Sequence, residues 1–266
     1  MFTHPRALTS QEQAQLADLI DGYLAALRRS REGHMPTPDR DMLTFQHLLR
    51  RHENSRQSYT KRQRESAEDF NLIAVLQVTD DEKRHSGMLA WLLDRRIEHL
   101  GTHAQGSLGF QLFLREMGLP AGYARERYWV RCEVAGEESR VDIEVAARGQ
   151  FIIHIENKLR AAEGEDQTDR EWRDLHGRAD ALGIARSGRQ NAVHAIFLSR
   201  DDDLPQNPNF VPISWSRIAG VLEAFAARAK PTDVKLFAAH YAKALRKFTV
   251  TKSPREKMEN EEEMAQ

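Results

Sequence analysis

The sequence feature that most constrains this chain is the run Phe-Ile-Ile-His-Ile-Glu-Asn-Lys at residues 151–158. Its first part is apolar and β-branched, which is typical of a strand. Apolar residues occupy both faces of this strand, so we expect it to lie in the centre of a sheet. Residues two apart in a strand point to the same face and are about 7 Å apart along the backbone. Glu156 and Lys158 should therefore stand side by side where the strand ends.

A second strand is predicted directly upstream, at residues 140–145, with Asp142 and Glu144 on the face opposite its valine and isoleucine side chains. Residues 146–150, which include a glycine, are few enough for a tight hairpin. If the two strands pair, Asp142 comes close to Glu156. Two carboxylates beside a lysine form a hard-oxygen site for a divalent cation, with an ammonium placed to act on water or phosphate.

The alternative interpretation of these residues is structural. Glu156 and Lys158 would form an ion pair on an exposed sheet, and Asp142 would be one more surface acid. The apolar character of residues 151–155 argues against exposure. An acid and a lysine at the end of a buried strand lose hydration, and a bound cation with a substrate phosphate would offset that cost. We therefore favour the cation site.

The composition restricts the class of protein. A chain of 266 residues can hold one large α/β domain with a helical extension. The formal net charge is −1, so affinity for nucleic acid must come from local patches. The only cysteine is Cys132, which excludes an internal disulfide and is expected to be a buried thiol. No apolar run approaches the ~18 residues of a membrane span, and the first residues lack a signal-peptide core, so we expect a cytoplasmic protein.

Hydrophobic periodicity predicts a helical extension over residues 1–65, with helices at 10–29 and 40–52. Their apolar stripes are most simply core, although this region could also bind a partner or form a homodimer. Residues 53–64 are polar and basic, and they form either a phosphate-contacting edge or a solvated loop or helix face.

The main domain is predicted over residues 66–250, followed by a charged, disordered tail over residues 251–266. Residues 201–212 are expected to be a loop rich in Asp, Pro and Asn. The remaining pattern predicts helices at 70–78 (buried), 82–93, 108–117, 165–182, 214–229 and 232–248, and strands at 128–134, 140–145, 151–158 and 192–198.

Two further motifs accompany the strand pair. The helix predicted at 82–93 reads Glu-Lys-Arg-His-Ser-Gly-Met-Leu-Ala-Trp-Leu-Leu, and Gln167 lies in the first turn of the helix that follows the 151–158 strand. Together with Asp142, a gap of thirteen residues and Glu156-Asn-Lys158, these motifs make the chain resemble the PD-(D/E)xK nuclease superfamily. Within it, the chain looks like a bacterial family with a Glu-x-x-His-Ser helix and an Ile-Glu-Asn-Lys strand motif. The similarity covers roughly residues 70–215.

The resemblance implies an α/β, restriction-endonuclease-like core, in which a helix, a three-stranded meander, a helix and a further strand form a mixed sheet flanked by helices. Helical extensions would lie at both ends of this core. It also implies hydrolysis of phosphodiesters with Mg²⁺, or Mn²⁺ as a substitute, leaving a 5′-phosphate and a 3′-hydroxyl.

The same resemblance implies roles for individual residues. Asp142, Glu156 and the backbone carbonyl of Asn157 would bind the cation. Lys158 would orient the attacking water and stabilise the transition state. Glu82 would be a further ligand, directly or through water. The substrate-binding set would be His85, which could instead position Glu82, with Ser86, Lys158 and Gln167, the last of which could also hold Lys158 in place.

Two residues depart from the family pattern, and two further polar residues lie close to the motif in the sequence. Val141 occupies the place of the proline in the superfamily name. The residue four after Gln167, often tyrosine in relatives, is Glu171, which argues against an exonuclease-like use of this helix. We interpret Glu144 as a solvent-facing strand residue rather than an additional ligand, and His154 as a core histidine.

Three functions fit these observations. The preferred one is a Mg²⁺-dependent nuclease acting on DNA in phage defence, restriction or repair. A second is a catalytically silent nuclease fold used as a binding or regulatory subunit, which the near-neutral charge would suit. A third is an RNA-cleaving toxin, which differs from the first only in substrate.

Overall fold

The computed structural model describes residues 38–67, 70–159, 163–200 and 203–249 of the chain. The chain divides into two compact units, Met1–Phe70 and Asn71–Gln266. The helix predicted at 10–29 and the tail predicted at 251–266 lie outside the described residues. The domain boundaries predicted at 65 and 250 stay predictions.

The described part of the first unit is one helix, α2 (Pro38–Ser66), 29 residues long. It extends beyond the helix predicted at 40–52 and includes the basic stretch 53–64. Ion pairs between residues three and four apart support this polar half, such as Arg56 with Glu53 at 3.1 Å. Leu49 is 46% exposed, so its interpretation as a core residue is wrong.

The second unit is built on a five-stranded mixed sheet in the order β1-β2-β3-β4-β5. The first three strands form an antiparallel meander, and β3, β4 and β5 are parallel to one another. The strands are β1 (Trp129–Ala135), β2 (Arg140–Ala147), β3 (Phe151–Asn157), β4 (Val193–Ser199) and β5 (Val211–Ser214). This arrangement confirms the predicted restriction-endonuclease-like α/β fold.

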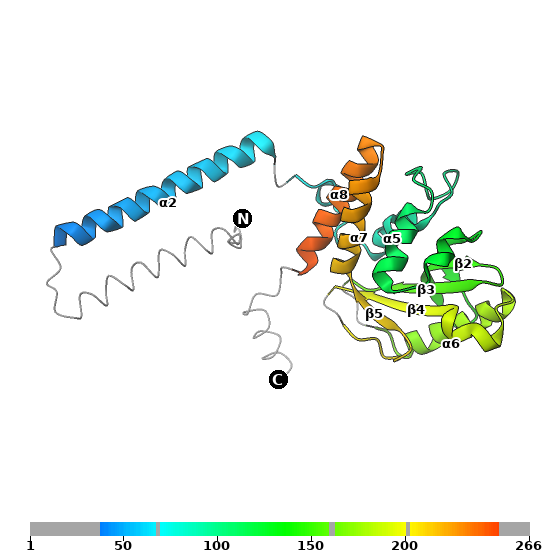
Figure 1. Ribbon diagram of the computed structural model, residues 1–266. Helices are drawn as coiled ribbons and strands as arrows, with labels where there is room; N and C mark the ends of the chain where they lie inside the picture. The colour runs from blue at the N-terminus through cyan, green and yellow to red at the C-terminus, as the bar shows by residue number, and fades with distance from the viewer. Residues whose placement is uncertain (1–37, 68–69, 160–162, 201–202, 250–266) are drawn as a thin grey trace, which may run out of the picture. The chain divides into compact units, whose positions relative to one another are not determined.

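Helices cover both faces of this sheet (Figure 1). One face packs against α4 (Glu82–Leu93), α5 (Leu108–Met117) and α7 (Trp215–Arg228), and α8 (Thr232–Arg246) packs beside α7. The other face packs against α6 (Gln167–Ala181). All seven residues of β3 are buried, as expected for a central strand. The short elements are α3 (Leu72–Val75) and the 3-10 helices η1 (Ala121–Arg125), η2 (Arg186–Asn191) and η3 (Lys247–Thr249).

Glycine is required at one turn and at one close approach in this fold. Gly149 adopts a left-handed φ of +70° in the turn between β2 and β3, so the predicted hairpin is present, although Ala146 and Ala147 belong to β2. Gly109 at the start of α5 lies against α4. A Cβ atom there would be 2.0 Å from the carbonyl oxygen of Leu92, so a larger residue would push the two helices apart.

Two segments differ from the predicted pattern. The buried helix predicted at 70–78 is a single turn, Leu72–Val75, because Asn71 caps its start and Gln77 adopts a left-handed φ of +56° just after it. Phe70 and Leu76 are at least half exposed, so this segment is not buried throughout. Strand β5 lies partly in the segment predicted as a loop; it is four residues long and contains a proline, which an edge strand tolerates.

Helix α6 is fastened to the meander by Asp174. Its carboxylate accepts hydrogen bonds from the backbone N–H groups of Glu137 and Glu138 and from the Ser139 hydroxyl, in the turn between β1 and β2. These bonds fix the helix that carries Gln167 against the sheet.

Along the described ranges of the chain, no helix has both the length and the apolarity that crossing a membrane requires.

Replacing Asp174 with alanine should destabilise the fold, because two backbone N–H groups and a hydroxyl lose a charged acceptor. We expect the free energy of unfolding to fall by about 1–3 kcal/mol in chemical denaturation. Asp180→Ala on the same helix is the control and should have a much smaller effect, since the Asp180 side chain is about half exposed and pairs with the side chains of Arg186 and Arg189 rather than with backbone N–H groups. An equal effect of the two substitutions would contradict the fastening role of Asp174.

Candidate active site

The structure brings Asp142 into contact with the β3 segment that ends in Lys158. The pairing of β2 with β3 aligns Ile143 with Ile155, so Asp142 lies opposite Glu156. The Asp142 carboxylate (Oδ2) accepts a hydrogen bond of 2.8 Å from the backbone N–H of Asn157. The predicted proximity of the two arms of the motif is therefore confirmed.

Glu156 and Lys158 form an ion pair at the carboxyl end of β3. The ammonium of Lys158 lies 3.1 Å from Oε1 of Glu156. The Glu156 side chain is only 3% exposed and that of Lys158 is 15% exposed. This pair is therefore buried, unlike the surface ion pair of the alternative interpretation.

Glu82 enters the same region from the first turn of α4. Its carboxylate (Oε1) accepts a hydrogen bond of 2.8 Å from the backbone N–H of Leu159, one residue after Lys158. Its negative charge also acts on Lys158. The start of α4 is therefore held against the end of β3.

The Asn157 side chain ties β3 to two helices. Its amide nitrogen donates to the backbone carbonyl of Glu82 at 2.8 Å and to the Ser86 hydroxyl at 3.0 Å. Its amide oxygen accepts from the indole N–H of Trp215, at the start of α7, at 3.1 Å. Asn157 alternates with Glu156, so its side chain faces α4 and α7 while the Glu156 side chain faces α6.

The structure corrects the substrate-binding roles predicted for His85 and Ser86. His85 is fully buried, with one ring nitrogen 3.1 Å from the Tyr241 hydroxyl and the other 2.9 Å from the carbonyl of Thr79. Ser86 is 1% exposed and donates to the carbonyl of Glu82 while it accepts from Asn157. Neither has a polar atom left for a phosphate. Both instead hold α4 in place.

Gln167 contacts carboxylates rather than Lys158. Its amide nitrogen lies 2.5 Å from Oε1 of Glu156 and 2.8 Å from Oε1 of Glu171. Glu171 is 1% exposed, so this helix brings a further acid to the site. The other predicted role of Gln167, a contact near the scissile phosphate, stays a prediction.

Glu144 was expected to face solvent, and the structure shows the opposite. It is fully buried under α6, where both of its oxygens accept hydrogen bonds of 2.9 Å from Arg178. The Trp129 indole N–H also donates to it, and His154 lies 3.4 Å away. These contacts explain its burial, and they lower the pKa of Glu144 to about 2 against the opposing effect of desolvation. His154 is a buried core residue, as expected.

The acids at the site are stabilised in their protonated form. Burial raises the pKa of Asp142 to about 7, and the negative charge of Glu156 adds to this increase. Burial also raises the pKa of Glu156, with the charge of Glu171 beside it, and burial raises the pKa of Glu171. Burial acts to lower the pKa of Lys158, but the neighbouring carboxylates hold it above its ordinary value. Three acids thus share one ammonium, so the site would carry an excess of negative charge if all three were ionised.

The residues present fit a divalent cation. Oε2 of Glu156 and Oε2 of Glu171 are buried and accept no hydrogen bond from the described part of the chain. A cation would supply the missing positive charge. In the described ranges, no three His, Cys, Asp or Glu side chains by themselves make a metal site. The ligands would therefore be Asp142, Glu156 and a backbone oxygen with several waters, a set that suits Mg²⁺.

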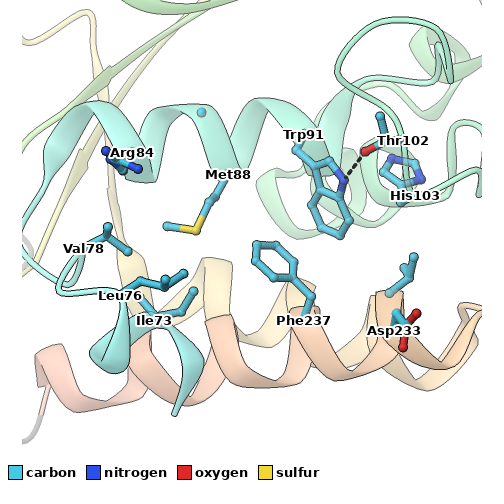
Figure 2. A pocket seen from close by; sticks show the side chains of 12 residues that line it. Ile73, Leu76, Val78, Arg84, Met88, Trp91, Thr102, His103, Asp233 and Phe237 are labelled. Atoms are coloured by element: carbon cyan, nitrogen blue, oxygen red, sulfur yellow. Dashed lines mark hydrogen bonds between the residues drawn. The ribbon is translucent and has the colours of Figure 1, made fainter.

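A separate cavity of about 610 Å³ lies between α4 and α8 (Figure 2). Met88 and Trp91 of α4 face Phe237 of α8 across it, and its lining includes none of the acids described above. The wall of this cavity is mostly apolar, and it lacks the paired acids and the lysine of the motif, so the polar residues at the carboxyl end of β3 remain the candidate active site.

The sequence pattern of the PD-(D/E)XK nuclease superfamily matches residues 70–260, which is most of the chain. The chain belongs to the PD-(D/E)XK nuclease superfamily. No curated protein and no solved structure matches it. Membership of this superfamily suggests nuclease activity, and PD-(D/E)XK nucleases generally use divalent metal ions.

Two PD-(D/E)XK site residues were missed by sequence reasoning. Glu171 is one helical turn from Gln167, so the spacing of the two residues places both on one face of the helix. In the family pattern, Glu171 stands out only because it replaces a tyrosine. Trp215 lies 58 residues after Asn157, and no local pattern connects them. Val141 at the proline position is a buried β2 residue paired with Val134, where valine suits a strand.

The raised pKa of Asp142 predicts a specific pH dependence for the metal-free PD-(D/E)XK protein. An acid whose pKa is higher in the folded state than in the unfolded state binds more protons when folded, so its contribution to stability falls as pH rises. Between pH 5 and pH 8, the wild type should therefore lose stability relative to Asp142→Asn. A difference of 1 kcal/mol in the free energy of unfolding corresponds to a difference of about 2–4 °C in Tm.

Thermal unfolding in EDTA at several pH values measures this difference, and histidine titration cancels because both proteins contain the same histidines. A constant Tm difference across this range would show that Asp142 is ionised with an ordinary pKa.

Proposed function

We propose that this protein is a Mg²⁺-dependent nuclease that hydrolyses phosphodiester bonds, with DNA as the preferred substrate. The contact that carries the proposal is the 2.8 Å hydrogen bond from Asn157 N–H to Asp142, which joins the first acid to the segment holding Glu156 and Lys158. Membership of the PD-(D/E)XK nuclease superfamily supports it.

Each side chain has a role that its surroundings support. Asp142 and Glu156 would hold Mg²⁺ with the Asn157 carbonyl, and Glu82 would assist through water. A bound Mg²⁺ would lower the pKa of a water molecule and neutralise charge on the scissile phosphate. The Lys158 ammonium, whose pKa is raised, would donate hydrogen bonds to the attacking water and to the phosphate. Gln167 would hold the Glu156 carboxylate in position.

The reaction would be attack of water on phosphorus with departure of the 3′ oxygen. The new bond joins the water oxygen to phosphorus, and the broken bond joins phosphorus to the leaving oxygen. The products would be a 5′-phosphate and a 3′-hydroxyl. One proton of the water ends on the leaving 3′ oxygen, and the other passes to solvent when the new phosphate group ionises.

Basic side chains beside the acids support a polyanionic substrate. Lys83 follows Glu82 on α4, and Arg140 lies two residues before Asp142 on β2; both side chains are more than half exposed. Both pair with Glu133, at 3.6 Å and 3.1 Å respectively. Surface ion pairs of this kind contribute little, so a phosphate can replace the glutamate at small cost.

The test is cleavage of linear, circular and single-stranded DNA, and of RNA, in Mg²⁺ or Mn²⁺. Lys158→Ala and Asp142→Ala should each reduce the cleavage rate by about 10²–10³-fold, because each removes charge stabilisation used in the transition state. Lys235→Ala, an exposed lysine on α8, is the matched control and should cleave like the wild type.

Cleavage that is equal in Lys158→Ala, or that persists in EDTA, would contradict the proposal. Binding of nucleic acid without cleavage, at an affinity that Asp142→Ala leaves unchanged, would instead support a catalytically silent binding subunit.

A further inference from the structure

The amide of Gln167 is fully used by three hydrogen bonds. Its nitrogen carries two hydrogens and lies within bonding distance of two carboxylate oxygens, those of Glu156 at 2.5 Å and Glu171 at 2.8 Å. Its oxygen accepts from the backbone N–H of Gly164 at 3.2 Å. Rotating the amide by half a turn would place its oxygen against two carboxylates, so only one orientation is stable.

Glu171 contacts two groups of the candidate site, the Gln167 amide and the Glu156 carboxyl group. It lies four residues after Gln167, on the same face of α6, and is 1% exposed. One of its oxygens bonds Gln167, and the other is buried and bonds nothing described. A buried acid with a single hydrogen-bond donor is costly for stability alone, which argues for a role at the site.

The helix that carries Glu171 is fixed independently of it. Asp174 fastens α6 to the turn between β1 and β2, and Arg178 bonds Glu144 through two hydrogen bonds. Because α6 is held at these points, the Glu171 side chain has a fixed position. It can therefore hold the Gln167 amide in place, and the amide can hold the Glu156 carboxylate.

We propose that Glu171 is a positioning residue of the cation site, which acts through Gln167 to hold Glu156 with one oxygen bound and the other free to face the ion. This inference rests on the proposed function, because it assumes that Glu156 binds a divalent cation. It adds a residue to the acids that the superfamily motif contains.

The physical consequence concerns the affinity for the cation. Without Glu171, one hydrogen of the half-buried Gln167 amide loses its acceptor, and the amide can turn away from Glu156. The Glu156 carboxylate then loses one of the two contacts that orient it and is free to rotate toward Lys158, 3.1 Å away. Loss of a hydrogen-bond partner behind a metal ligand typically weakens metal binding about 10–100-fold.

Calorimetric titration of the full chain with Mn²⁺ alone tests the inference. Glu171→Ala should weaken binding about 10-fold or more. Glu171→Gln keeps an oxygen that accepts the same hydrogen bond, so its affinity should stay within about threefold of the wild type. Asp180→Ala, on the same helix but away from Gln167 and with a side chain about half exposed, is the control and should bind like the wild type. Circular dichroism and unfolding in EDTA establish that each variant is folded.

A double substitution tests whether the effect passes through Gln167. In a Gln167→Ala background, the further change Glu171→Ala should leave the Mn²⁺ affinity nearly unchanged, because the intermediate partner is already gone. Additive losses in the double variant would overturn the proposed route. Equal weakening by Glu171→Gln and Glu171→Ala would overturn it as well, because charge rather than position would then be the cause.

Failure of the inference and failure of the proposed function give different results. If the wild type binds Mn²⁺ and Glu171→Ala binds it equally well, only the role of Glu171 is overturned. If the wild type does not bind Mn²⁺, the cation-dependent nuclease and the role of Glu171 are overturned together.

Discussion

The structure depends on one constraint, the concentration of negative charge at the edge of a buried sheet. Asp142, Glu156 and Glu171 are brought together around the single ammonium of Lys158, and two carboxylate oxygens there accept no described hydrogen bond. Such an arrangement is unfavourable for folding by itself, because ionised acids lose hydration and repel one another. A bound divalent cation would relieve both effects. The acids at the candidate site therefore make the free energy of folding less favourable, as is common at sites that bind a ligand.

The two faces of strand β3 contact different helices, and each face holds a different polar side chain. Glu156 faces α6, where Gln167 holds it, while Asn157 faces the other helices and bonds Glu82, Ser86 and Trp215. The polar side chain of Asn157 is thereby fully satisfied in the core. The acids thus sit on a rigid frame built from elements distant in sequence, as a preorganised site requires.

The two-residue alternation of strands and the shortness of the hairpin were enough to predict that Asp142 would meet Glu156, because both are local properties of the chain. The resemblance to the superfamily likewise implied that His85 and Ser86 lie near the site. It could not show which way they point in the folded protein. The structure buries both, with His85 against Tyr241 and Ser86 against Asn157, far along the chain.

By itself, then, the sequence determined the order of the first four strands and the approach of Asp142 to the Glu156–Lys158 segment, because periodicity and spacing act over a few residues. Only the tertiary structure decided that Glu144 is buried against Arg178 and that Glu171 shares Gln167 with Glu156. Whether a charged side chain is buried depends on the partner that reaches it from another element. That partner is chosen when helices pack on the sheet, and no local pattern of the chain contains it.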